Sequence, residues 1–186
     1  MTTPEHPAAE EAVREHIMLD ANSAIRWFEH GYPHPLARWH HHPEIEIHLI
    51  QESSGTALVG DAAVAFEAGD LFLIGSDLPH NWISAVAPGT VIEGRDALVQ
   101  FAPELLQRIS ADVLDLAAVE KLLDQSRLGT KYLGRTAHQG GAVLRSMRDT
   151  VGLDRFSRFL RLLHVLLAAP AEERLSLSSA PVGMPL

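Results

Sequence analysis

The segment from Arg38 to His48 contains the densest group of side chains that could bind a metal ion. Its sequence is Arg-Trp-His-His-His-Pro-Glu-Ile-Glu-Ile-His. If the segment is extended, successive side chains alternate between two faces. One face then carries His40, His42, Glu44, Glu46 and His48. Two histidines two residues apart, followed by a carboxylate, can converge on one divalent cation. The competing interpretation is a half-exposed strand whose polar face contacts water.

A second segment, from Gly69 to Trp82, adds a histidine that another strand could deliver. It reads as a turn, an apolar strand, a second turn and then His80 at the start of the next strand. Trp82 shares the strand face of His80 and could form an apolar wall for a small molecule, with a core position as the alternative. Arg38 and His48 are the other candidate ligand-binding residues, Arg38 because its guanidinium could hold an anionic group if it is not simply at the surface.

The composition restricts the kind of site. The chain has 186 residues with 11 His and no Cys, so disulfides, thiolate zinc sites and Cys-x-x-Cys redox sites are excluded. Seven of the histidines lie between residues 30 and 80. Of these, we expect His30 and His34 in exposed loops and His41 on the face opposite the metal ligands. The net charge of −9 argues against nucleic-acid binding by this segment.

Neither end of the chain has a membrane or export signal. The apolar stretch Phe159–Ala169 is interrupted by Arg161 and His164 and is shorter than the roughly 20 residues that cross a bilayer. The first 15 residues are acidic and rich in Pro and Ala, unlike a secretory signal. We therefore expect a cytoplasmic protein without a membrane segment.

Short apolar or alternating runs separated by turn residues dominate the first hundred residues. They predict strands at Ala24–Phe28, Ala37–His40, Glu44–Gln51, Thr56–Val59, Ala63–Phe66, Leu71–Ile74, Asn81–Val86 and Ala97–Phe101. Because no helical pattern separates them, they favour an antiparallel sandwich or barrel over βαβ units.

After Pro103 the apolar residues recur at helical spacing. Three helices are predicted: one capped by Asp112 or Asp115, one beginning with a Thr136–Gln139 capping box, and one capped by Asp154. The expected organisation is a disordered arm at 1–16, a β-barrel at 17–102, a helical module for packing and dimerisation at 103–170, and a linker-like tail at 171–186.

The two histidine segments resemble the two motifs of the cupin family. The first motif is matched by His40, His42 and Glu46, and the second by Gly69 and His80. The sequence departs from the family pattern at four places: Gly75 and Asp77 replace the usual Pro and Gly, Gly55 arrives late, and Ser84 replaces the usual Asn. The resemblance implies a mainly β fold, a cupin-like antiparallel barrel (double-stranded β-helix), followed by a small helical module. It also implies that His40, His42, Glu46 and His80 point inward and could bind one divalent metal such as Zn, Ni, Fe or Mn.

The residue pattern of these segments resembles one branch of the cupin family more closely, the N-terminal sensing domain of AraC-type transcription regulators. The similar residues are His-x-His-Pro-Glu-x-Glu, Gly-Thr-x-x-x-Val-Gly-Asp and Gly-Asp-Leu-x-Leu-x-Gly-x-x-Leu-Pro-His-x-Trp. The resemblance implies a small-molecule effector, a homodimer formed through the helices, and DNA contact only through a C-terminal domain that this sequence does not include, since it has no helix-turn-helix signature.

Three functions remain open from the sequence. The first is an effector-sensing domain with a metal in the barrel. The second is a metal-dependent cupin enzyme of dioxygenase or isomerase type, for which two histidines and a carboxylate form a known ligand set. The third is a metal-free barrel that binds its ligand through hydrogen bonds and the Trp82 indole.

Overall fold

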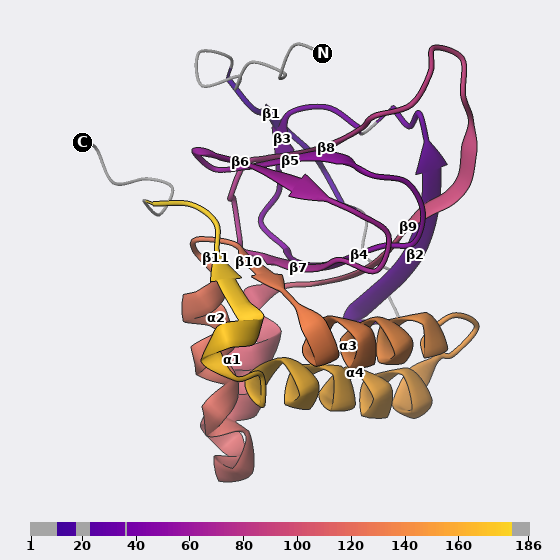
Figure 1. Cartoon of the computed structure of the whole chain (residues 1–186). Coiled ribbons are helices and arrows are strands. Elements are labelled where there is room, and N and C mark those ends of the chain that lie inside the picture. Colours follow the sequence, from indigo (N-terminus) through magenta and orange to yellow (C-terminus); the bar gives the residue numbers. More distant parts are fainter. Residues whose placement is uncertain (1–10, 18–22, 36, 180–186) are drawn as a thin grey trace.

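Two antiparallel sheets face each other and enclose a barrel, and helices cover one of the sheets (Figure 1). The computed structural model describes residues 11–17, 23–35 and 37–179. The strands are β1 (Val13–Arg14), β2 (Ile25–Tyr32), β3 (His40–His41), β4 (Ile45–Ile50), β5 (Gly55–Val59), β6 (Ala62–Phe66), β7 (Leu71–Ile74), β8 (His80–Ser84), β9 (Ile92–Phe101), β10 (Thr130–Tyr132) and β11 (Arg174–Ser176). The predicted fold class, a mainly β cupin-like architecture followed by helices, is confirmed.

The strand order explains how distant segments meet. One sheet has the order β1-β3-β8-β5-β6 and the other has the order β11-β10-β7-β4-β9-β2. Among the described strands all pairs are antiparallel except β1 with β3. The β3–β8 pair aligns His40 with His80, so the two histidine segments of the sequence become neighbours across a ladder.

The alternation along β4 separates two cores. Ile45, Ile47 and Leu49 pack toward the helices in a large cluster that includes side chains from α1 to α4. Residues of the other parity, Glu46, His48 and Ile50, are equally buried, and Ile50 joins a smaller apolar cluster inside the barrel with Trp82. The polar face of this strand is therefore an interior face, and the solvated-face interpretation is wrong.

The helices are α1 (Pro103–Asp112), the 3-10 segment η1 (Leu114–Val119), α2 (Glu120–Ser126), α3 (Gly134–Ser146), α4 (Gly152–Leu167) and the 3-10 turn η2 (Ala171–Glu173). Figure 1 shows α3 and α4 side by side beneath the six-stranded sheet. At Gly140 of α3 a Cβ atom would lie 2.5 Å from Leu71 Cδ2, so the absence of a side chain lets the helix lie close to the sheet.

The structure differs from the helix predictions in four details. The sequence pattern did not predict α1. Thr136 does not begin its helix, because α3 starts at Gly134 and Glu173 supplies the capping carboxylate from a distant part of the chain. Asp154 lies in the first turn of α4 and not at its cap. Asp112 is the last residue of α1, so it does not cap the following segment, and the side chain of Asp115 lies outside the described part of the chain.

Regular structure extends into segments for which the sequence pattern indicated none. The expected arm at 1–16 contributes β1, with its first ten residues outside the described part. The region after the barrel contributes β10 and, from the expected tail, β11, which extend the six-stranded sheet beyond β7. Residues 180–186 lie outside the described part. Among the described residues no helix is long and apolar enough to span a membrane.

Candidate metal centre

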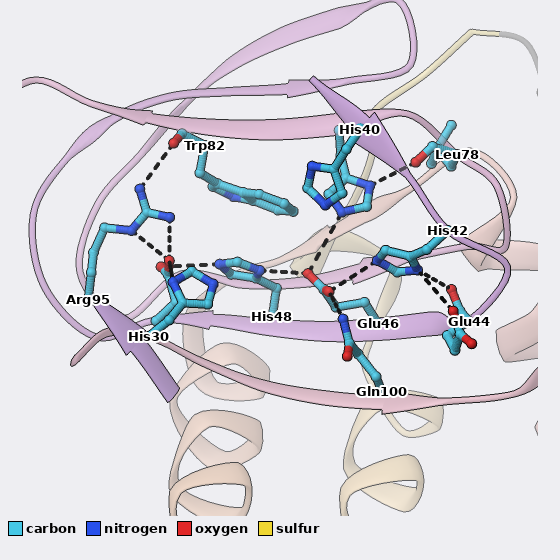
Figure 2. A network of polar contacts seen from close by, with 12 residues as sticks. His30, His40, His42, Glu44, Glu46, His48, Leu78, Trp82, Arg95 and Gln100 are labelled. Atoms are coloured by element: carbon cyan, nitrogen blue, oxygen red, sulfur yellow. Dashed lines mark hydrogen bonds and ion pairs between the residues drawn. The ribbon is translucent and has the colours of Figure 1, made fainter. Parts of the chain in front are cut away.

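Three histidines from two neighbouring strands converge inside the barrel, and Figure 2 labels two of them, His40 and His42. His40 and His80 are aligned partners on β3 and β8, and His42 follows directly after β3. Each ring offers a nitrogen within 4.8 Å of the others, and all three residues are buried. The ring centroids of His40 and His80 are 4.3 Å apart, and those of His42 and His80 are 5.1 Å apart. This triad is the densest concentration of nitrogen donors in the site.

The orientation of the rings is fixed by backbone carbonyl groups. The Nδ1 atoms of His40, His42 and His80 lie 2.7, 3.0 and 2.8 Å from the carbonyl oxygens of Arg38, Glu44 and Leu78. A carbonyl can only accept, so each Nδ1 carries the proton and, in the neutral ring, Nε2 keeps a free lone pair. In the structure the buried Nε2 atoms of His42 and His80 have no hydrogen-bond partner. Metal-binding histidines are held in this way.

A buried carboxylate lies beside the triad. Glu46 Oε2 is 3.3 Å from His42 Nε2, and Oε1 is 4.0 Å from His80 Nε2. Gln100 of β9 donates to Oε2 at 2.8 Å, and the Nδ1 atom of His48 donates to Oε1 at 2.7 Å. Gln100 and His48 therefore fix the orientation of the Glu46 carboxylate, which faces the imidazoles. The four residues inferred from the motifs lie together.

The charge states follow from burial and neighbours. Burial and the adjacent His40 lower the pKa of His80 well below its usual value, and burial also lowers the pKa of His40. Burial disfavours charged His42, but the Glu46 carboxylate outweighs this effect and raises its pKa. Burial opposes ionisation of Glu46, yet His42 and His48 hold its pKa well below the usual range. Two neutral imidazoles and an ionised carboxylate thus face one point, which is a favourable donor set for a cation.

A chain of buried charges continues away from the triad (Figure 2). His48 lies between Glu46 and Asp96, whose Oδ1 is 3.1 Å from His48 Nε2. Burial disfavours the charged form of His48, but Asp96 and Glu46 outweigh burial and raise its pKa, so the two carboxylates favour the imidazolium form. Asp96 also pairs with Arg95, which is 1% exposed and donates to the Trp82 carbonyl. Polar residues of β9 were missed by the sequence reasoning, although their alternation within an apolar strand could have signalled them.

One further acidic residue reaches the triad from the N-terminal segment. Glu15 follows β1, and its Oε2 lies 3.3 Å from His40 Nε2. Its side chain is only 11% exposed. Nothing in the sequence around Glu15 distinguishes it from the other acidic residues of this segment, so only the β1–β3 pairing identifies it.

The other predicted residues are distributed differently. Trp82 is buried and stacks on His48 with centroids 3.9 Å apart. The side chain of Arg38 is exposed, and only its carbonyl takes part in the site. The expected loop position of His30 is wrong: it lies on β2, 3.4 Å from Asp96, and stacks on His34. The polar residues around His48 and Trp82 enclose a cavity of about 30 Å³.

His41 has the outward position that its parity predicts, and it pairs with Asp77 at 2.9 Å.

One comparison with known proteins identifies the family. The profile of the family described as AraC-like ligand binding domain matches residues 22–180. Among curated proteins no relative matches the chain.

The solved structures to which the chain is similar are distant in sequence. ToxT from Vibrio cholerae is 9% identical with a TM-score of 0.47, and the match covers 75% of this chain and 54% of ToxT. The AraC-like transcriptional activator CuxR is 12% identical with a TM-score of 0.46, covering 84% and 51%. HEPD from Streptomyces albus, with 2-hydroxyethylphosphonate and Fe(II) bound, is 15% identical with a TM-score of 0.34, covering 82% and 42%. The chain spans about half the length of these proteins.

Proposed function

Because the chain belongs to the AraC-like ligand-binding domain family, we propose that it is the effector-sensing domain of a transcription regulator and that it holds a divalent metal ion in its barrel. The observation that supports the ion is the inward-facing imidazole set of His40, His42 and His80 with Glu46 beside it. The buried Nε2 atoms of His42 and His80 lack a hydrogen-bond partner, which is unfavourable, and a cation would satisfy both.

The proposed ligands are His40, His42, His80 and Glu46. The ion would supply a positive charge among their nitrogen and oxygen donor atoms. Imidazole and carboxylate donors suit Zn, Ni, Fe or Mn. Arg38, His48 and Trp82 are the proposed contacts for a small molecule. His48 and Trp82 line the cavity, whereas Arg38 could contact only a molecule at the barrel mouth.

DNA binding is assigned to a basic domain outside this chain, since a net charge of −9 repels phosphate groups. We also propose that the protein forms a homodimer through the helices and that it is cytoplasmic. Reading the gene beyond Leu186 tests the regulator assignment. A continuing frame that encodes helix-turn-helix motifs is expected, and a stop codon at that point would overturn it.

The alternative, a metal-dependent enzyme, has the same donor set in its favour. It needs space for an organic substrate beside the ion, and a cavity of about 30 Å³ holds only about two water molecules. The small cavity therefore counts against the enzyme, and it equally leaves no room for an organic effector beside the ion.

Metal analysis of protein purified without a histidine tag tests the site. We expect one divalent ion per chain in the unaltered protein and loss of the ion in His80→Ala, because His80 offers a neutral, preoriented nitrogen. His41→Ala is the matched control, since it removes a neighbouring histidine that faces away from the triad. Absence of bound ion, even after equilibration with Zn²⁺, Ni²⁺, Fe²⁺ or Mn²⁺, would refute the metal site.

A further inference from the structure

The interior of the barrel has room for an ion but not for an organic effector. Its cavity of about 30 Å³ is lined by charged and aromatic side chains, among them Glu15, His40, Glu46, His48 and Trp82. Sites for organic ligands typically measure about 300–1,000 Å³. The rings of His48 and Trp82 stack with centroids 3.9 Å apart, which leaves no room for a ligand between them. An ion, by contrast, needs only donor atoms that can converge on it at coordination distance.

Glu15 and His40 face each other with a carboxylate oxygen and a ring nitrogen, two atom types that bind transition-metal ions. His40 donates its Nδ1 proton to the Arg38 carbonyl at 2.7 Å, which leaves Nε2 as an acceptor. Glu15 Oε2 lies 3.3 Å from that Nε2 atom. A divalent cation between these two atoms would be held by both, and the low dielectric constant of the buried site would strengthen the attraction.

The arm, defined as residues 11–17, has a weak apolar attachment to the barrel. Its backbone amides at Val13 and Glu15 donate to the carbonyls of Trp39 and His41 at 3.1 and 2.8 Å. Val13 is 43% exposed, so it contributes little buried apolar surface. The position of Glu15 relative to His40 therefore has a strong influence on whether the arm stays in place.

We propose that a divalent transition-metal ion is itself the signal that this domain senses, and that Glu15 joins its ligand set and so ties the arm to the barrel. The inference rests on the metal site proposed above. With the ion bound, Glu15 and His40 share it as ligands, so the arm is held through Glu15 as well as through its backbone hydrogen bonds. Without the ion, only those hydrogen bonds and the direct contact between Glu15 and His40 hold the arm.

The donor types define the class of ion. Three imidazole nitrogens with one or two carboxylates suit Zn²⁺, Ni²⁺, Co²⁺, Fe²⁺ or Mn²⁺. Mg²⁺ and Ca²⁺ prefer oxygen ligands, so they serve as negative controls.

Hydrogen exchange of the arm in the full chain tests the inference. Adding Zn²⁺ should slow exchange of the amides in residues 11–17 by about tenfold or more, because local opening becomes rarer. Chelation should restore the original rate, and Mg²⁺ should have no effect. In Glu15→Gln, Zn²⁺ should still bind through the histidines, but with weaker affinity and without slowing exchange of the arm. The absorption spectrum of bound Co²⁺ should also differ from that of the unaltered protein, because one ligand has changed.

Glu11→Gln, an exposed change in the same arm, is the matched control and should behave like the unaltered protein. If Zn²⁺ binds but arm exchange and the Co²⁺ spectrum are the same with Glu15→Gln, the inference is wrong while the metal site stands. If no ion binds to the unaltered protein, the metal site itself is wrong and the inference fails with it.

Discussion

At the scale of single residues, the site depends on which ring nitrogen carries the proton. The carbonyls of Arg38, Glu44 and Leu78 fix the protons of three imidazoles on Nδ1 and leave Nε2 directed at the centre. The same residue type has the opposite role at His48, where carboxylates on both sides favour the charged ring. Environment and not residue identity thus separates a metal donor from a structural cation.

The buried pair of Arg95 and Asp96 gives a stability prediction at this scale. Asp96→Ala should lower the free energy of unfolding by about 3–5 kcal/mol, because it leaves the Arg95 guanidinium buried without its carboxylate. Asp154→Ala, which removes the partner of the exposed Arg158, should change it by about 1 kcal/mol or less. Urea unfolding followed by tryptophan fluorescence measures both. Equal decreases in the free energy of unfolding of the two variants would show that the buried pair contributes no more to stability than the exposed pair.

At the scale of elements, β4 and β9 supply the site from alternating positions. Glu46 and His48 point inward on β4, while Gln100 on the adjacent β9 supports Glu46 and Asp96 supports His48. The residues between them, such as Ile47 and Val99, pack toward the helices. One strand pair therefore connects the interior of the barrel with the helical side.

The start of α3 provides a prediction about pH. Glu173 accepts hydrogen bonds from the Arg135 and Thr136 amides at 3.1 and 2.9 Å, and from the Thr136 hydroxyl. These bonds from Thr136 and Arg135 lower the pKa of Glu173 below its usual value. Its contribution to stability is therefore present above the unfolded-state pKa of about 4.3 and is lost as the pH falls through the lower folded-state value.

We expect Glu173→Gln to lower the thermal midpoint at pH 7 and to lose this difference as the pH is lowered below about 4. Glu172→Gln, an exposed change at the adjacent residue, should leave the midpoint unchanged at either pH. Thermal scans by circular dichroism between pH 3 and 7 measure both variants. A difference that grows on acidification would show that the sign is wrong.

At the scale of the whole molecule, the helices and the six-stranded sheet share one core. Phe159 of α4 meets Phe101 of β9 edge to face, with centroids 4.9 Å apart. The segment after the barrel also gives β10 and β11 to the sheet. The helical part is therefore not an independent unit in packing, although the sequence pattern changes at Pro103.

We expect Phe159→Ala to lower the free energy of unfolding by about 3–5 kcal/mol, since Phe159 is fully buried. Because the core is shared, helix loss by circular dichroism and barrel loss by tryptophan fluorescence should shift together. Leu153→Ala, at a residue that is 80% exposed, should change stability by about 0.5 kcal/mol or less. Two separate transitions would indicate that the helices and the barrel unfold independently.

The sequence by itself determined the faces of the strands and the identity of the motif residues. Alternation placed His40, His42 and Glu46 on one face of an extended segment, because the period of two is a local property of an extended chain. The motif resemblance added His80 and the expectation that all four residues point inward. Alternation also located most strands to within a few residues, since turn residues separate them.

Only the tertiary structure decided which residues meet. The alignment of His40 with His80, the approach of Glu15 along β1 and the support of Glu46 by Gln100 depend on strand order and register. Local sequence patterns carry no information about pairing between distant strands, because long-range pairing reflects packing of the whole chain. The same reason explains why Glu173, 39 positions after Gly134 at the start of α3, could not be recognised as its cap.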